Sequence, residues 1–155
     1  MKKYTIKEKH FDELTNAELY EIMRERVAVF VVEQKCPYQE LDGKDIDSYH
    51  LFMQREDGSI AAYLRVLKKK DETGVAQIGR VLTTERGSGL GGALLHAGVL
   101  KAQNEYHADE IYLEAQVYAV GFYQKEGFRV VSEPFLEDGI PHVQMRLSLN
   151  GRSKG

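Results

Sequence analysis

Apolar and polar positions change their period repeatedly along the chain, which predicts alternating strands and helices. A half-buried strand is expected where apolar and polar residues alternate and β-branched and aromatic residues gather. A helix is expected where apolar residues recur three and four positions apart. The segments predicted as strands are 4–11, 48–55, 59–68, 76–82, 111–117, 128–133 and 142–149.

Three helices are predicted between these strands. The first starts at a capping box, Thr15-x-x-Glu18, in which each residue satisfies a backbone N–H group of the other. Its helical pattern continues to Phe30, where the β-branched residues of 29–32 weaken it. The second helix follows a glycine-rich turn, and the third is a short one over 118–126.

The predicted order of elements is β-α-loop-β-β-β-α-β-α-β-β. Glu56-Asp57-Gly58 is a strong hairpin turn between the second and third strands. A helix separates the fourth and fifth strands, so these two must be parallel. Residues 135–141 are expected to form a loop between the last two strands. The chain is therefore predicted to be an α/β domain with a mixed, mostly antiparallel sheet, flanking helices and one parallel strand pair.

The glycine-rich turn, Arg86-Gly87-Ser88-Gly89-Leu90-Gly91-Gly92, opens the second helix. Because glycine has no Cβ atom, the backbone can bend sharply there and a ligand can approach its N–H groups. At a helix N-terminus these N–H groups are unpaired, and the helix dipole favours an anion. Arg86 adds positive charge. We therefore predict a phosphate site, and pyrophosphate in particular, rather than a turn that only starts a helix.

Two familiar phosphate loops fit this turn incompletely. A mononucleotide P-loop ends in Gly-Lys-Ser/Thr, whereas alanine and leucine follow Gly92, which excludes it. The dinucleotide fingerprint G-x-G-x-x-G is satisfied by Gly87, Gly89 and Gly92, and Glu114 lies about twenty residues further on. Residues 83–86 separate the strand from the first glycine, which weakens the dinucleotide interpretation but leaves it open.

A third pattern, Arg/Gln-x-x-Gly-x-Gly/Ala after a strand, is matched by Arg86, Gly89 and Gly91. With this pattern the GNAT superfamily of acyl-CoA-dependent N-acyltransferases holds the pyrophosphate of CoA, and the chain resembles that superfamily. A second segment resembles another GNAT signature, in which asparagine is commoner at the position of Gln116. This segment is Gln116-x-x-Ala119-x-x-Phe122-Tyr123-x-Lys125-x-Gly127-Phe128. Within the superfamily, the chain resembles the small bacterial ElaA-type proteins over residues 4–149, in the segments 24–38, 40–50, 78–81 and 137–142.

This resemblance implies a single GNAT N-acetyltransferase domain over residues 1–150, followed by a tail at 151–155. It also implies that the parallel strands splay apart and that the pantetheine arm of acetyl-CoA, the acetyl donor, enters between them. The residues implied to bind the donor are Val81, Leu82, Thr83, Arg86, Gly87, Ser88, Gly89, Leu90, Gly91, Gly92, Gln116 and Tyr123.

Acetyl transfer to an amine requires a neutral amine, stabilisation of the carbonyl oxyanion and a proton for the leaving thiolate. Backbone N–H groups near 81–83 are candidates for the oxyanion or for orienting the thioester. Tyr123 matches the general-acid position of the family, and a phenol with a pKa of about 10 stays protonated at neutral pH. Glu114 and His142 are the candidates for the general base. The alternatives are packing for Tyr123 and structural hydrogen bonds for Glu114 and His142.

In the resembled family the first-helix region lines the acceptor site. The predicted acceptor-binding residues are Phe30, Glu33, Glu40 and His50, with a structural anchor as the alternative for His50. The two glutamates would attract an ammonium group. The aspartates of 42–47 fail the spacing of a calcium loop, so no metal is expected.

The 155 residues suffice for one domain that buries about 70% of its unfolded surface. A net charge of −3 gives no support to a role on nucleic acid or an anionic membrane. The polar N-terminus and the lack of an apolar run of about 18 residues argue against a signal peptide or a membrane span. The single cysteine, Cys36, cannot form an internal disulfide, which favours the cytoplasm.

We therefore predict a cytoplasmic, acetyl-CoA-dependent N-acetyltransferase. It would transfer the acetyl group directly to a primary amine of a small molecule or to an exposed amino group. Two alternatives are a non-catalytic CoA- or nucleotide-binding sensor and an NAD(P)-dependent oxidoreductase. Family members often pair through sheet edges, so a homodimer is also considered.

Overall fold

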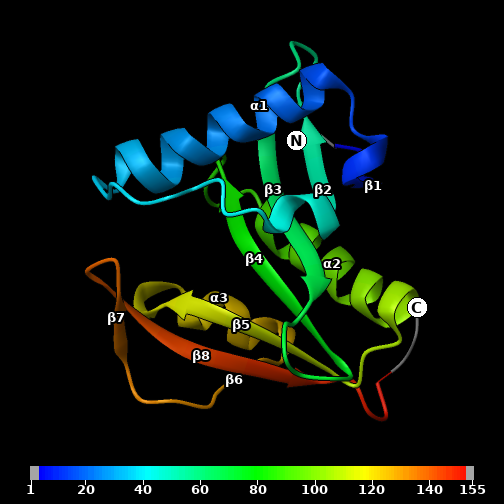
Figure 1. Cartoon of the computed structure of the whole chain (residues 1–155), viewed down its shortest axis with the longest axis vertical. Coiled ribbons are helices and arrows are strands. Elements are labelled where there is room, and N and C mark those ends of the chain that lie inside the picture. The colour runs from blue at the N-terminus through cyan, green and yellow to red at the C-terminus, as the bar shows by residue number, and fades with distance from the viewer. Residues whose placement is uncertain (1–3, 153–155) are drawn as a thin grey trace.

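The computed structural model describes residues 4–152, which form one eight-stranded sheet flanked by helices (Figure 1). Residues 153–155 of the predicted tail lie outside the described residues. The strand order is β1-β2-β3-β4-β5-β8-β6, with β7 paired to β8, and only β4 and β5 pair in parallel. The predicted mixed, mostly antiparallel α/β sheet is thus confirmed. The strands are β1 (Lys7–His10), β2 (Tyr49–Gln54), β3 (Ile60–Lys68), β4 (Val75–Thr83), β5 (Glu110–Gln116), β6 (Arg129–Val130), β7 (Phe135–Glu137) and β8 (Ile140–Ser148).

The helices begin and end close to the predicted positions. The Thr15 hydroxyl accepts a hydrogen bond from the N–H of Glu18 at 3.0 Å, and the Glu18 carboxylate accepts one from the N–H of Thr15 at 2.9 Å. This confirms the capping box. No helix within residues 4–152 is long and apolar enough to cross a membrane. The helices are α1 (Asn16–Arg26), the π-helical η2 (Val27–Glu33), α2 (Leu90–Tyr106) and α3 (Val120–Glu126), with the 3₁₀ turns η1 (Phe11–Glu13), η3 (Lys44–Asp47) and η4 (Val117–Ala119).

The prediction of a loop at residues 135–141 was wrong, because β7 and β8 form a hairpin there. Asp138 and Gly139 join the two strands with φ values of +51° and +79°. Two successive residues with positive φ match the right-handed twist of a hairpin, and Asp-Gly is a preferred pair for such a turn. This turn chemistry extends β8 toward the N-terminus and adds β7 as a short strand beside it.

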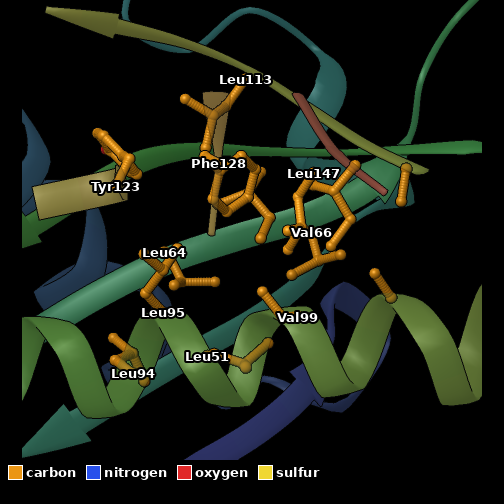
Figure 2. Close-up of a cluster of buried hydrophobic side chains, with 14 of the residues drawn as sticks. Leu51, Leu64, Val66, Leu94, Leu95, Val99, Leu113, Tyr123, Phe128 and Leu147 are labelled. Carbon is orange, nitrogen blue, oxygen red and sulfur yellow. The ribbon is translucent and has the colours of Figure 1, made fainter. Parts of the chain in front are cut away.

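The two faces of the sheet carry separate cores, because successive side chains of a strand point to opposite faces. On one face, α2 and α3 pack against a large cluster of buried residues from most of the strands. Figure 2 shows Leu95 and Val99 of α2 pointing toward Leu64 and Val66 of β3. On the other face, α1 places Ile22 against a smaller cluster from β2, β3 and β4. The sheet therefore forms the middle layer of the domain.

The parallel strands β4 and β5 separate soon after they meet (Figure 1). Their pairing covers three residue pairs that begin at Val75 and Glu110, and beyond these β4 pairs only with β3 and β5 only with β8. A bulge in β4 accompanies the separation, because Arg80 and Val81 together face Leu64 of β3, and Arg80 has a φ of +53°. A bulge bends and twists its strand. The two strands therefore open toward their carboxyl ends, as the family resemblance implies.

Candidate active site

A pocket of about 350 Å³ lies where β4 and β5 open. It is lined by residues of β3, β4, β5, η4 and α3, of the β7–β8 hairpin and of the segment from Phe30 to Lys44. The opening of the sheet thus brings residues that are far apart in sequence to one place. Six of the predicted site residues line the pocket, namely Phe30, Val81, Glu114, Gln116, Tyr123 and His142.

The glycine-rich turn connects the end of β4 to the N-terminus of α2. Gly87 and Gly89 have φ values of +73° and +80°, a backbone conformation that other residues adopt at a cost. Gly89 is the N-cap and has no side chain to cap the helix, and in the described chain the only side-chain partner of a first-turn N–H is the Ser88 hydroxyl, which accepts from Leu90 at 3.4 Å. The N–H groups there consequently face outward, and Arg86 is exposed beside them. Gly92 has no atom within 4 Å of the position that a Cβ would take, so the approach to these N–H groups is open.

Tyr123 brings a buried hydroxyl to the pocket. The residue is 8% exposed, packs edge to face on Phe122 and Phe128, and still lines the pocket. Within residues 4–152 its hydroxyl makes no hydrogen bond. Burial, and to a smaller extent the neighbouring Tyr118, raises the pKa of Tyr123 above its usual value. The phenol is therefore protonated at neutral pH and has a proton to give to a ligand in the pocket.

Two carboxyl groups and a histidine meet on the face of β5, β7 and β8 that borders the pocket. Glu114 accepts a hydrogen bond from the Tyr112 hydroxyl at 2.6 Å. Burial first, and then a hydrogen bond and repulsion from Glu114, raise the pKa of Glu137. His142 Nδ1 lies 2.7 Å from the carbonyl oxygen of Ile140, and its Nε2 lies 3.7 Å from Glu137 Oε2. Since a carbonyl only accepts, Nδ1 carries a proton and faces the backbone, which leaves Nε2 toward the pocket.

Gln116, which the resemblance assigns to the donor, spans the pocket to the end of η2. Its amide nitrogen donates to Gln34 Oε1 at 3.2 Å, and the Gln34 amide nitrogen lies 3.4 Å from Gln116 Oε1. This pair of amides links β5 to the segment that follows η2. A ligand arm that enters between β4 and β5 would compete for these part-buried hydrogen bonds, and a neutral hydrogen bond contributes only about 0.5–1.5 kcal/mol.

The predicted role of Glu40 in acceptor binding does not fit its position. Glu40 is 4% exposed and lies outside the pocket. Its Oε2 accepts hydrogen bonds from Arg26 Nε at 2.6 Å and from Arg80 Nε at 2.9 Å. Arg26 is fully buried and also pairs with Asp45 at 2.6 Å. Glu40 thus neutralises the buried Arg26, because a charge out of water requires a close partner, and it also pairs with Arg80, whose side chain is 20% exposed.

Three further predicted residues also lie elsewhere than expected. His50 is fully buried, with Nδ1 2.6 Å from the Tyr63 hydroxyl and Nε2 2.9 Å from the carbonyl oxygen of Asp45, so it is a structural anchor rather than an acceptor contact. Glu33 is exposed at the end of η2 and does not line the pocket. The Leu82 side chain belongs to the core beneath α1, which leaves only its backbone for the donor.

Arg65 and Arg80 line the pocket and were not predicted. Arg65 pairs with Asp42 at 2.7 Å, and the Arg80 guanidinium lies 5.5 Å from the centre of the Tyr38 ring. Each arginine stands among mostly apolar strand residues, where a charge requires a close partner. Glu137 was also missed, because its place beside the pocket depends on the hairpin that the sequence reading took for a loop.

The dinucleotide alternative does not fit the sheet. In a doubly wound fold, the strand before the glycine fingerprint belongs to an open, mostly parallel sheet. Here β4 is antiparallel to β3 and parallel to β5 over three residue pairs only. The interpretation as an NAD(P)-dependent oxidoreductase therefore loses its structural basis.

Comparisons with known proteins agree with this geometry. A family model described as an acetyltransferase (GNAT) domain matches residues 16–149. Protein ElaA of Escherichia coli is 40% identical over 140 residues, which cover 88% of this chain and 91% of that protein. Its crystal structure matches with a TM-score of 0.87 and 37% identity, covering 94% of this chain and 100% of that one.

The crystal structure of an acyl-CoA N-acyltransferase from Pseudomonas aeruginosa matches with a TM-score of 0.85. The two chains are 41% identical, and the match covers 93% of this chain and 99% of that one. The family model covers most of the chain, and the same residues carry the glycine turn, the splayed strands and the buried tyrosine. The chain therefore belongs to the GNAT family of acetyltransferases and is a homologue of ElaA.

Proposed function

We propose that the protein is an acetyl-CoA-dependent N-acetyltransferase that transfers the acetyl group directly to a primary amine of a small molecule or to an exposed amino group. One observation carries the proposal. The buried residue Tyr123, whose hydroxyl has no hydrogen-bond partner within residues 4–152, lines the pocket that opens between β4 and β5. A proton donor is thereby kept ready beside the place where a thioester arm would enter.

The residues around the glycine-rich turn fit the pyrophosphate of the donor. The uncapped first turn of α2 offers N–H groups, Arg86 offers charge, and the space in front of Gly92 is free. The backbone of Val81–Thr83, on the side that β5 no longer covers, and Gln116 would hold the pantetheine arm. The bound donor supplies an activated thioester carbonyl.

The side chains of the pocket divide the proton transfers among them. Tyr123 protonates the leaving thiolate, a role that its raised pKa permits over the whole neutral range. Glu114 and His142 both line the pocket, and one of them takes the proton that the amine must lose. Since acid and base lie on opposite sides of the opening, on α3 and on β5 and β8, donor and acceptor meet between them in one complex.

Cys36 supports direct transfer rather than an acyl-cysteine route. Its Sγ donates to the carbonyl oxygen of Asp138 at 3.4 Å, and no base contacts it within the described residues. A nucleophilic cysteine needs a partner that stabilises its thiolate. The free thiol also agrees with a reducing compartment, and we place the protein in the cytoplasm.

Calorimetric titration with acetyl-CoA, CoA and NADH in parallel tests the proposal. We expect micromolar binding of both CoA ligands and no binding of NADH. A chain that bound NADH tightly and ignored the CoA ligands would refute the proposed donor. Release of CoA in the presence of primary amines then tests the transfer itself.

Replacement of Gly92 by glutamate is expected to abolish donor binding and keep the fold. A side chain fits there, since no atom lies within 4 Å of the Cβ position, and a negative charge in the first turn suits the helix dipole. The same charge repels a pyrophosphate. We expect the Kd for acetyl-CoA to rise at least about tenfold, which corresponds to roughly 1.4 kcal/mol, while the melting temperature stays equal or rises.

Gly92→Gln is the matched control, since it has the same shape without the charge. We expect Gly92→Gln to bind acetyl-CoA more tightly than Gly92→Glu. The difference between their Kd values should become smaller at high salt, because salt screens the repulsion. Equal and unimpaired binding by both variants would place the pyrophosphate elsewhere.

A further inference from the structure

The carboxylates of the pocket differ in their partners. Asp42 pairs with Arg65 at 2.7 Å and with Arg80 at 3.4 Å. Glu114 and Glu137 also line the pocket, but no arginine or lysine within residues 4–152 forms an ion pair with either of them. This wall of the pocket therefore carries negative charge that the protein does not neutralise with its own cations.

The strand register holds these two side chains together. Gln116 of β5 and Phe135 of β7 both lie opposite His142 of β8. Residues directly opposite in antiparallel strands share a face, as do residues two apart on one strand. Glu114, two residues before Gln116, and Glu137, two after Phe135, consequently lie on the same face as His142. The pair stands on hydrogen-bonded strands and not on a free loop.

The two carboxyl groups lie on one face of the sheet and line the same pocket. Burial and the nearby Glu114 raise the pKa of Glu137, because two ionised carboxylates on the same face repel each other. Tyr123 lines the same pocket; the residue is 8% exposed, and its hydroxyl has no hydrogen bond in the described chain. A ligand that brings positive charge and N–H donors would satisfy both the acid pair and this hydroxyl.

We propose that Glu114 and Glu137 together bind the acceptor as an ammonium ion, and that the acceptor is an aliphatic primary amine of net positive charge. The inference rests on the proposed function, since it names the acceptor class of that same site. An acceptor with a carboxylate close to its amine would place like charges side by side against this wall, which is unfavourable.

The acid pair also prepares the amine for transfer. The ammonium ion displaces the proton that the raised pKa of Glu137 favours on that carboxyl group, and this proton leaves to solvent. One N–H bond of the ammonium then breaks, its proton passes to the pair, and the nitrogen keeps the electron pair with which it attacks the thioester carbonyl. Ammonium and doubly charged pair thus become neutral amine and singly charged pair, so charge and atoms balance. Glu114 is the base in this scheme, and Glu137 sets its charge.

The proton balance of the pair depends on the groups that face it. Tyr112 and Glu114 face Glu137 from β5, His142 faces it from β8, and Asp138 adjoins it in the turn. Repulsion from Glu114 and Asp138 favours the protonated form, whereas a charged His142 favours the ionised form. Binding of a cation is therefore expected to release a proton, and more of it at mildly acid than at neutral pH.

Putrescine and γ-aminobutyrate are suitable probes, because they share a chain length and differ in the charge at the far end. Each is titrated calorimetrically into the full-length protein saturated with CoA, in two buffers of different ionisation enthalpy. We expect putrescine to bind with proton release and γ-aminobutyrate to bind at least about tenfold more weakly. Glu114→Gln and Glu137→Gln should each weaken putrescine binding at least about tenfold and leave CoA affinity unchanged.

Glu133→Gln is the control, since Glu133 is exposed, lies just before β7 and does not line the pocket. It should bind putrescine as the unchanged protein does. Equal binding of the two probes, unchanged binding by both glutamine variants, or putrescine binding without proton release would each overturn the inference. Binding of CoA without binding of putrescine would overturn it and leave the proposed function standing, whereas lack of CoA binding would count against the proposed function.

Discussion

Tyr123→Phe is expected to lower the turnover by about 10²–10⁴-fold, the usual contribution of a general acid, with unchanged affinity for acetyl-CoA. The variant removes one hydroxyl that has no hydrogen-bond partner within residues 4–152, so the fold loses nothing measurable. Release of CoA in the presence of an accepted amine measures the turnover, and calorimetry measures the affinity. Because burial raises the pKa of Tyr123, the unchanged protein should show no alkaline loss of turnover from this group below a pH of about 10.

Tyr106→Phe serves as the control for a lost phenol. Tyr106 lies at the far end of α2, where its hydroxyl is 3.5 Å from the carbonyl oxygen of Val66, outside the pocket. Its turnover should stay within about twofold of the unchanged protein, since surface changes shift free energies by about 0.5 kcal/mol or less. Full turnover in Tyr123→Phe would remove the hydroxyl from the mechanism. A chain that binds acetyl-CoA but transfers no acetyl group to any amine would instead be a sensor.

Arg26→Met is expected to lower the free energy of unfolding by about 3–5 kcal/mol, because removing one partner of a buried ion pair leaves the others uncompensated. Arg26 is fully buried and holds Glu40 and Asp45, each at 2.6 Å. Against a total stability of about 5–15 kcal/mol for a domain, this is the largest single loss that we expect. Urea unfolding at neutral pH measures it.

Arg24→Met is the matched control on the same helix. The Arg24 side chain is 66% exposed, and its pair with Glu21 at 3.2 Å should contribute about 0.5 kcal/mol or less. The loss in Arg26→Met should also depend on pH. Interactions led by the hydrogen bond from Arg26 hold the pKa of Asp45 below its usual value of 3.8 despite the opposing effect of burial.

A carboxylate with a lowered pKa stabilises the folded state above its unfolded pKa, and this contribution disappears as the pH falls through the folded pKa. The difference between the unchanged protein and Arg26→Met should therefore be full at neutral pH and shrink below a pH of about 4. A difference that grew on acidification would contradict the assignment of the buried ion pairs.

The elements of the fold could largely be read from local pattern. The capping box of Thr15 and Glu18, the end of α3 at Gly127 and the uncapped glycine turn each depend on residues within a few positions of one another. Helix caps and turns are short-range structures, so their sequences contain most of the energy that specifies them. Two local predictions were less accurate: the strand predicted at 128–133 is only Arg129–Val130, and the Asp138-Gly139 turn makes a hairpin where a loop was predicted at 135–141.

The sequence predicted only some of the residues that line the pocket. Tyr123, Glu114 and His142 were predicted from motif and chain order, and all three line the pocket. His50 and Glu40 have the same functional groups as His142 and Glu114. Both are nevertheless buried, and both form hydrogen bonds within the protein. Sequence shows which groups a chain contains, but burial and pairing decide whether a charged group binds a ligand or another part of the protein.

The sequence alone thus determined the α/β order of elements, the glycine turn that opens α2 and the tyrosine that follows it. Only the tertiary structure decided that β4 bulges at Arg80 and separates from β5. It also decided that Glu40 pairs with the buried Arg26 and does not line the pocket, and that Glu137 lies on the same face as Glu114. The physical reason is the distance along the sequence over which the deciding interactions act. Local elements are fixed by neighbours along the chain, whereas the charge and proton content of a pocket depend on groups that only folding brings together.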